Sequence, residues 1–235
     1  MKRASRAQQV MDIYIHVEEH VTIFSGIKFA DFIECTAISI ENMLLLKANY
    51  VGKKHFRKFE LLEGMDDISE LLREDIYNYG DFCFVDYIST ESVNRLSNEQ
   101  IAELLYLAHI FEPLKSPFFE VLQNKFAYLS HDNGWYCKLF CKEWQISVSI
   151  LLNKLQKNIQ TAVCNNEYTL PKNLIEIIQK SVMSGLLVSV DLSKKQRKMC
   201  TIKLYEVGKY ENPDILFNTI KRDKLPTLFE ISLIN

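Results

Sequence analysis

A chain of 235 residues, of which 48% are hydrophobic and 25% charged, has the composition of a globular protein and excludes a disordered one. No apolar run reaches the roughly 18 residues of a membrane helix, and charged residues follow MKRASRAQQ where a signal peptide would be apolar. The sequence therefore predicts a soluble protein with a cytoplasmic location.

The net charge of −2 hides an uneven distribution of charge. Residues 60–112 hold thirteen acidic side chains and two basic ones, Arg73 and Arg95. The segments on both sides are basic. A contiguous acidic stretch between basic flanks is typical of a charged surface that selects a partner.

The amino-terminal third predicts strands. Residues 1–9 form a flexible basic tail, and alternating apolar residues then indicate strands at 12–17 and 21–24. Gly26 ends this pattern. Residues 38–46 fit a helix or a strand equally well, and residues 55–62 predict another strand.

The middle of the chain mixes helices and strands. The motif Asp67-x-x-Glu70 is typical of a capping box and predicts a helix from there to Ile76. Residues 81–87 predict a strand. A second capping box, Ser97-x-x-Gln100, predicts a helix over 98–111, and Ser116-Pro117 predicts a short helix.

Next comes a predicted hairpin. Strands at 125–130 and 135–141 are joined by His131-Asp132-Asn133-Gly134, a typical hairpin turn. A long amphipathic helix follows over 143–163.

The last 70 residues predict a helix, a hairpin, a second helix and a strand. Their expected ranges are 171–184, 186–192 with 199–207, 213–222 and 228–234. Together these patterns predict an α+β fold, with a mixed or antiparallel sheet and packed helices. We expect a main domain at 10–165 and a small unit at 166–235.

Motifs for cofactors and metals are absent from the sequence. No two of the seven glycines lie closer than twelve residues, whereas a phosphate-binding loop needs several within about eight. His16 and His20 share a side of their segment, but two imidazoles do not make a metal site. We expect no cofactor and no metal.

The favoured hypothesis is a non-catalytic binding or regulatory protein, such as an inhibitor or immunity-type protein. An acidic and aromatic surface would engage a protein partner, and its negative charge would favour a basic one. Its expected members are Glu70, Glu74, Asp75, Asp81, Asp86, Glu91, Glu99, Glu103 and Glu112, with Trp135 and Tyr136 as exposed aromatics.

Two alternatives remain open. The helix 171–184 and the basic hairpin after it resemble the recognition helix and wing of winged-helix DNA-binding domains. The carried residues would be Lys172, Asn173, Lys180, Lys194, Lys195, Arg197 and Lys198.

The second alternative is a hydrolase. Cys83 or Cys137 would be the nucleophile and His131 the base, oriented by Asp132 or Asp86. The plain interpretation is that His131 and Asp132 are turn residues.

Four stretches carry a resemblance to a known family. They are KFADFIE (28–34), GDFCFVDY (80–87), EQIAELLYLAH (99–109) and SPFFEVLQNKFAYLSHDNGWYCKLF (116–140). They resemble small soluble bacterial proteins of unknown function, some of which carry an oxalate:formate antiporter label, over about residues 10–145. The resemblance implies no catalytic residues, and a transport role would need membrane spans that this sequence lacks.

Overall fold

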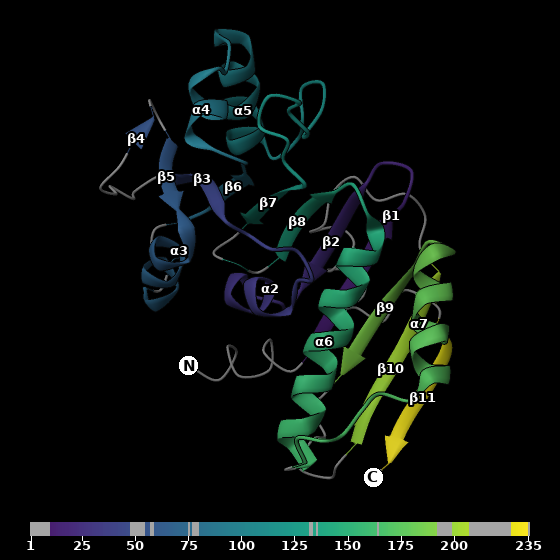
Figure 1. Cartoon of the computed structure of the whole chain (residues 1–235). Coiled ribbons are helices and arrows are strands. Elements are labelled where there is room, and N and C mark those ends of the chain that lie inside the picture. The colour runs from purple at the N-terminus through teal and green to yellow at the C-terminus, as the bar shows by residue number, and fades with distance from the viewer. Residues whose placement is uncertain are drawn as a thin grey trace. The chain divides into compact units, whose positions relative to one another are not determined.

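The computed structural model describes residues 10–47, 55–56, 59–74, 76, 80–131, 134, 136–163, 165–191, 199–206 and 227–234. The chain divides into two compact units (Figure 1). Unit 1 joins both ends of the chain, Met1–Ala37 and Glu143–Asn235, whereas unit 2 is the continuous segment Ile38–Lys142.

The sheet of unit 1 is built from strands far apart in the sequence. Its order is β11 (Thr227–Ile234), β10 (Met199–Glu206), β9 (Leu186–Asp191), β1 (Val10–His16) and β2 (Val21–Ser25). Each neighbouring pair is antiparallel. Because β9 pairs with β1, the boundary predicted at 165/166 falls inside unit 1.

The described residues of unit 1 include the helices α2 (Phe29–Cys35), α6 (Trp144–Val163) and α7 (Lys172–Met183). Helix α6 is tied to α2 by the ion pairs Lys154–Asp31 and Lys157–Glu34. It is tied to β2 by a buried hydrogen bond in which Thr22 Oγ1 donates to Ser147 Oγ at 2.6 Å. These contacts join the two chain segments of unit 1.

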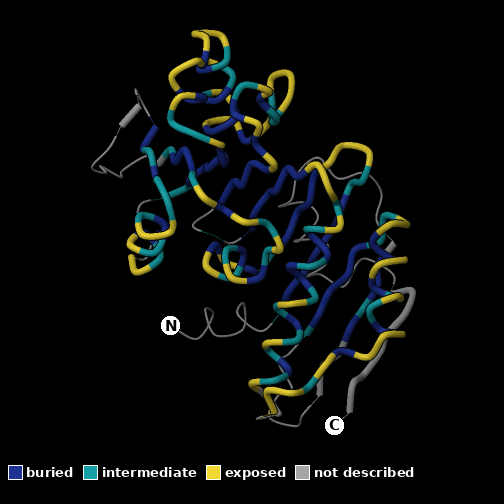
Figure 2. The backbone as a smooth tube through the Cα atoms, viewed as in Figure 1, coloured by how far each residue is buried: buried dark blue, intermediate teal, exposed yellow. Residues whose placement is uncertain are grey.

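The strands of unit 2 also pair in antiparallel fashion. Their order is β8 (Tyr136–Cys141), β7 (Phe126–His131), β6 (Phe82–Asp86), β3 (Asn42–Lys47), β5 (Phe59–Glu63) and β4 (His55–Phe56). Strands β6 and β8 are buried along their length and β7 along all but its last residue, as the dark blue segments in Figure 2 show. The antiparallel strands and the helices of the two units confirm the predicted α+β class.

An aromatic cluster fills one face of the unit 2 sheet. Phe84 lies between Tyr128, with ring centroids 5.0 Å apart and nearly parallel, and Phe126, at 5.6 Å and perpendicular. Phe82 also stacks on Tyr128. These rings are at most 1% exposed, so most of the aromatic density of this region serves packing.

The helices of unit 2 are α3 (Gly64–Arg73), α4 (Thr90–Asn94) and α5 (Asn98–Ile110). The capping box predicted for α5 is confirmed. Gln100 N–H donates to Ser97 Oγ at 3.2 Å, and Ser97 N–H donates to Gln100 Oε1 at 3.0 Å. Both bonds satisfy backbone groups that a helix start leaves unpaired.

Three predicted elements are wrong. Helix α3 begins at Gly64 instead of Asp67, because the Asp67 carboxylate accepts the N–H of Glu63 at the true helix start. Residues 116–123 form turns without a helix, and Ser116 Oγ accepts the N–H of Phe118 there. The strand predicted at 55–62 is two strands that pair with each other.

Other outcomes concern elements that the sequence left open. Residues 38–46 contain the strand β3, while the short helices α2 and α4 were not predicted. The helix predicted at 213–222 and the hairpin tip 193–198 lie outside the described residues.

Candidate functional site at the end of helix α5

Helix α5 ends in a residue with an unusual backbone. Phe111 has a φ of 63° and is the left-handed C-cap, where its N–H donates to the carbonyl of Leu107 at 2.9 Å. A bulky residue rarely adopts this conformation, because its Cβ crowds the backbone. The Lys138 ammonium donates to the Phe111 carbonyl at 3.3 Å and also pairs with Glu112. These contacts hold the turn in place.

Phe111 belongs to a group that we call the histidine cluster: Asp81, Phe111, His131 and Tyr136. The His131 ring lies between two aromatic rings, with centroids 4.3 Å from Phe111 and 4.9 Å from Tyr136. His131 Nδ1 is 3.5 Å from Asp81 Oδ2, and both side chains are more than a third exposed. The pairing of β7 with β8 sets His131 directly opposite Tyr136.

A histidine beside a carboxylate can act as a general base. The two thiols proposed as nucleophiles, however, are not placed where His131 could activate them. Cys137 pairs with Ser130, next to His131 in β7, so its side chain lies on the opposite face of the sheet. Cys83 shares the face of His131 but is buried, with 3% of its surface exposed.

Burial also disfavours the reactive form of both thiols. It raises the pKa of Cys83 to about 12 and that of Cys137 to about 12, although Tyr128 and Ser130 hydrogen bonds oppose the shift at Cys137. Because the thiolate is the nucleophile, these cysteines do not support the hydrolase hypothesis.

A second feature lies on the solvent side of α5 and the loop after it. We call it the α5 outer face: Glu99, Glu103, Tyr106, Ile110 and Leu114. Tyr106, Ile110 and Leu114 are 39%, 54% and 57% exposed. Lys115 Nζ lies 2.7 Å from Glu103 Oε1, so the side chain of Lys115 in the loop reaches back to the helix.

The sequence held a signal for this face that the prediction did not use. Tyr106 and Ile110 are four residues apart, so they share a side of the helix. They lie outside the buried stripe formed by Ile101, Leu104 and Leu107. Apolar residues on both sides of one helix indicate that both sides meet other surfaces.

The predicted acidic surface is not brought together. Glu70 and Glu74 are exposed on or just after α3, Glu91 on α4, and Glu99 on α5. Figure 1 shows α3 standing apart from α4 and α5 within unit 2. Glu103 and Glu112 are paired with lysines, Asp81 joins the histidine cluster, and Asp75 lies outside the described residues.

Two residues predicted for this surface are buried. Asp86 is 8% exposed and accepts backbone hydrogen bonds from Lys125 and Phe126 at 3.0–3.1 Å. Tyr136 is 5% exposed because it packs on His131. The assignment of both to an exposed surface is therefore wrong, and Trp135 lies outside the described residues.

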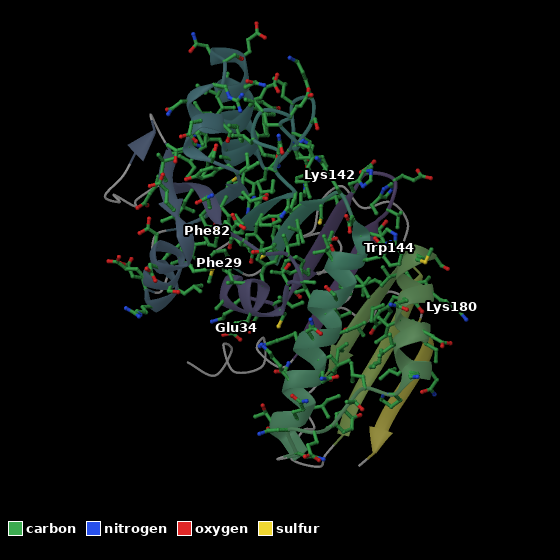
Figure 3. All side chains as sticks on the ribbon, in the orientation of Figure 1. Phe29, Glu34, Phe82, Lys142, Trp144 and Lys180 are labelled. Atoms are coloured by element: carbon green, nitrogen blue, oxygen red, sulfur yellow. The ribbon has the colours of Figure 1, made fainter. Side chains whose placement is uncertain are left out.

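The predicted DNA-binding residues fall into two groups. Lys172, Asn173 and Lys180 are exposed on or near the outer side of α7, where Figure 3 shows Lys180, but exposed Glu176 shares that side. Lys194, Lys195, Arg197 and Lys198 lie outside the described residues.

The hairpin that follows α7 is also placed unlike a wing. A wing is a hairpin that projects from a small sheet. Here, each strand of the hairpin has a further neighbour, because β9 also pairs with β1 and β10 also pairs with β11. The interior position of both strands gives the winged-helix hypothesis no support.

Comparison with known proteins adds no assignment. No family model, curated protein or solved structure matches this chain. Among the described residues, no set of three or more His, Cys, Asp and Glu side chains is arranged to hold a metal ion. Within the same part of the chain, no helix has the length and apolarity required to cross a bilayer.

Proposed function

We propose that this chain is a non-catalytic binding protein that engages a protein partner through the α5 outer face. The observation that carries the proposal is the exposure of three large apolar side chains at the end of one helix: Tyr106 and Ile110 share a side of α5, and Leu114 follows in the loop after it. Contiguous apolar exposure of this kind is typical of interaction surfaces, whereas single exposed residues are not.

The surroundings of the face favour binding of a partner over catalysis. Phe111, fixed by Lys138 and by the His131 ring, sets the direction in which the chain leaves α5. A surface held in one conformation loses little conformational entropy on association, which favours affinity. The Asp81–His131 pair at its edge has no suitable nucleophile among the thiols considered.

The proposal also covers the cellular location and the family of the chain. The four described cysteines Cys35, Cys83, Cys137 and Cys141 are unbridged and buried, which fits a reducing compartment and hence a cytoplasmic location. We also propose membership of the bacterial family that the four stretches resemble, which assigns no activity.

The test compares a face variant with a matched control. The double substitution Ile110→Asp and Leu114→Asp should reduce retention of a native-cell partner about tenfold or more, since it removes apolar contact from the centre of the interface. The measurement is affinity capture from lysate with quantitative mass spectrometry, with immobilised wild type as reference.

The control carries Ile88→Asp and Met183→Asp, two exposed apolar residues that do not belong to the α5 outer face. It should retain the same partner as the wild type. Far-UV circular dichroism checks that both variants fold. Equal retention by the face variant and the control would refute the proposal.

A further inference from the structure

We infer that the element that docks on the α5 outer face is an amphipathic helix whose apolar stripe is flanked by lysine or arginine. This inference rests on the proposed function and adds the chemistry of the partner. Three observations support it: the spacing of the apolar residues, the charges beside them, and the fixed end of α5.

The spacing of the apolar residues matches a helix. Ala102, Tyr106 and Ile110 follow one another at intervals of four, about 6 Å along the helix axis, and all three are exposed. Leu114 adds a further exposed apolar side chain in the loop after the helix. A partner helix presents anchors at i, i+3 or i+4 and i+7, which recur at the same rise.

The charges beside this row are negative. Helix α5 carries Glu99 and Glu103 and no lysine or arginine. The nearest cation on the face is Lys115, whose pKa is raised by its hydrogen bond to Glu103 and by the charge of that carboxylate and of Glu99. Since Lys115 can neutralise only one of these two carboxylates, the charged rim of the face, Glu99, Glu103 and Lys115, has a net negative charge.

Negative rim charge selects the partner. Basic residues beside the apolar stripe of the docking helix would meet Glu99 and Glu103, and this attraction would speed the encounter. A second copy of this chain would instead bring two more carboxylates and no lysine on its own α5. Charge complementarity therefore favours a basic helix over self-association.

The fixed end of α5 keeps the row straight. Phe111 is held by its ring contact with His131 and by the hydrogen bond from Lys138, so the last turn of α5, which carries Ile110, is fixed in one arrangement. A helix can dock on such a surface without first ordering it.

The experiment uses three synthetic helical peptides of about 18 residues. The first has leucines at i, i+3, i+4 and i+7 flanked by lysines, the second has glutamates in place of the lysines, and the third has serines in place of the leucines. Binding to the full chain is measured by fluorescence anisotropy at low and high salt.

The wild type is expected to bind the lysine peptide at least tenfold more tightly than the glutamate peptide. It is expected to show no binding of the serine peptide. The pair Glu99→Lys and Glu103→Lys should reverse the preference between the first two. Ile110→Asp should weaken binding of the lysine peptide, although the substitution adds negative charge to the face. This result would distinguish docking on the apolar row from nonspecific electrostatic attraction.

Several results would overturn the inference. Equal binding of the lysine and glutamate peptides would show that the rim does not select charge, and no binding of any peptide would show that the partner is not a helix. In both cases the lysate capture described above decides the proposed function separately. A wild-type dimer in sedimentation that Ile110→Asp dissociates would make a second copy the occupant.

Discussion

Replacing Asp86 with alanine is expected to lower the free energy of unfolding by about 2–4 kcal/mol at pH 5. The Asp86 carboxyl group accepts the N–H of Lys125 with both oxygens and the N–H of Phe126 with Oδ1, at 3.0–3.1 Å. Alanine would leave these amides without that acceptor at the start of β7, and unpaired buried amides cost about 1–3 kcal/mol each. Urea denaturation followed by circular dichroism measures the loss.

The exposed Glu99→Ala variant is the control, and we expect its unfolding free energy to stay within about 0.5 kcal/mol of the wild type. An Asp86→Ala variant as stable as Glu99→Ala would show that the carboxylate is not needed to hold β7.

The stabilising effect of Asp86 should depend on pH. Burial raises the pKa of Asp86 from 3.8 to about 6, and the backbone hydrogen bonds and Lys125 oppose that rise only in part. Since the pKa of the folded state lies above that of the unfolded state, the contribution is complete below about pH 4 and is lost as the pH rises through 6. Its full size is about 3 kcal/mol.

The Asp86→Asn variant isolates the pH-dependent contribution of Asp86 to stability, because asparagine does not titrate. The stability of the wild type relative to Asp86→Asn should fall by up to about 3 kcal/mol between pH 4.5 and pH 7.5. A difference that grew with pH would mean that the amides stabilise the ionised carboxylate more than burial penalises it.

Replacing Gly26 with alanine is expected to destabilise unit 1 by about 2–4 kcal/mol. Gly26 has a φ of +72°, and a Cβ added there would lie 2.1 Å from the carbonyl oxygen of Val10 and 3.2 Å from Met11 Cα. The left-handed backbone costs alanine about 1 kcal/mol, and the backbone of β1 would also have to move. The loss is measured by thermal and urea denaturation.

Gly185 provides a matched control. Its φ is +71°, yet nothing lies within 4 Å of a Cβ added there. Gly185→Ala should therefore show the conformational cost alone, about 1 kcal/mol. If the two variants lost the same stability, the close approach to Val10 would have no energetic weight.

Local patterns in the sequence predicted much of the secondary structure. Ser97 and Gln100 identify the start of α5 because the capping box involves residues three apart. The segment around Gly134 identifies the β7–β8 hairpin, and Gly134 indeed has a φ of +79°. Such signals lie within a few residues of the structure that they specify.

Features that depend on distant residues were not accessible in this way. The pairing of β1 with β9 joins Met11 to Val190, and no local pattern encodes it. An aspartate that accepts buried amides, such as Asp86, has the same local sequence signature as one on the surface. Glu70 and Glu99 both belong to the acidic segment 60–112, but they lie on helices that the fold separates (Figure 1).

The joining of both chain ends in unit 1 has a consequence for biosynthesis. The β1–β2 hairpin leaves the ribosome early, but β9, its neighbour in the sheet, emerges about 180 residues later. At typical elongation rates this delay is on the order of ten seconds or more. Unit 2 is continuous and is translated in full within that interval, while β1 has an unpaired edge. Strand edges left open during translation invite aggregation or chaperone binding, so nascent unit 1 is the part of this protein most in need of protection.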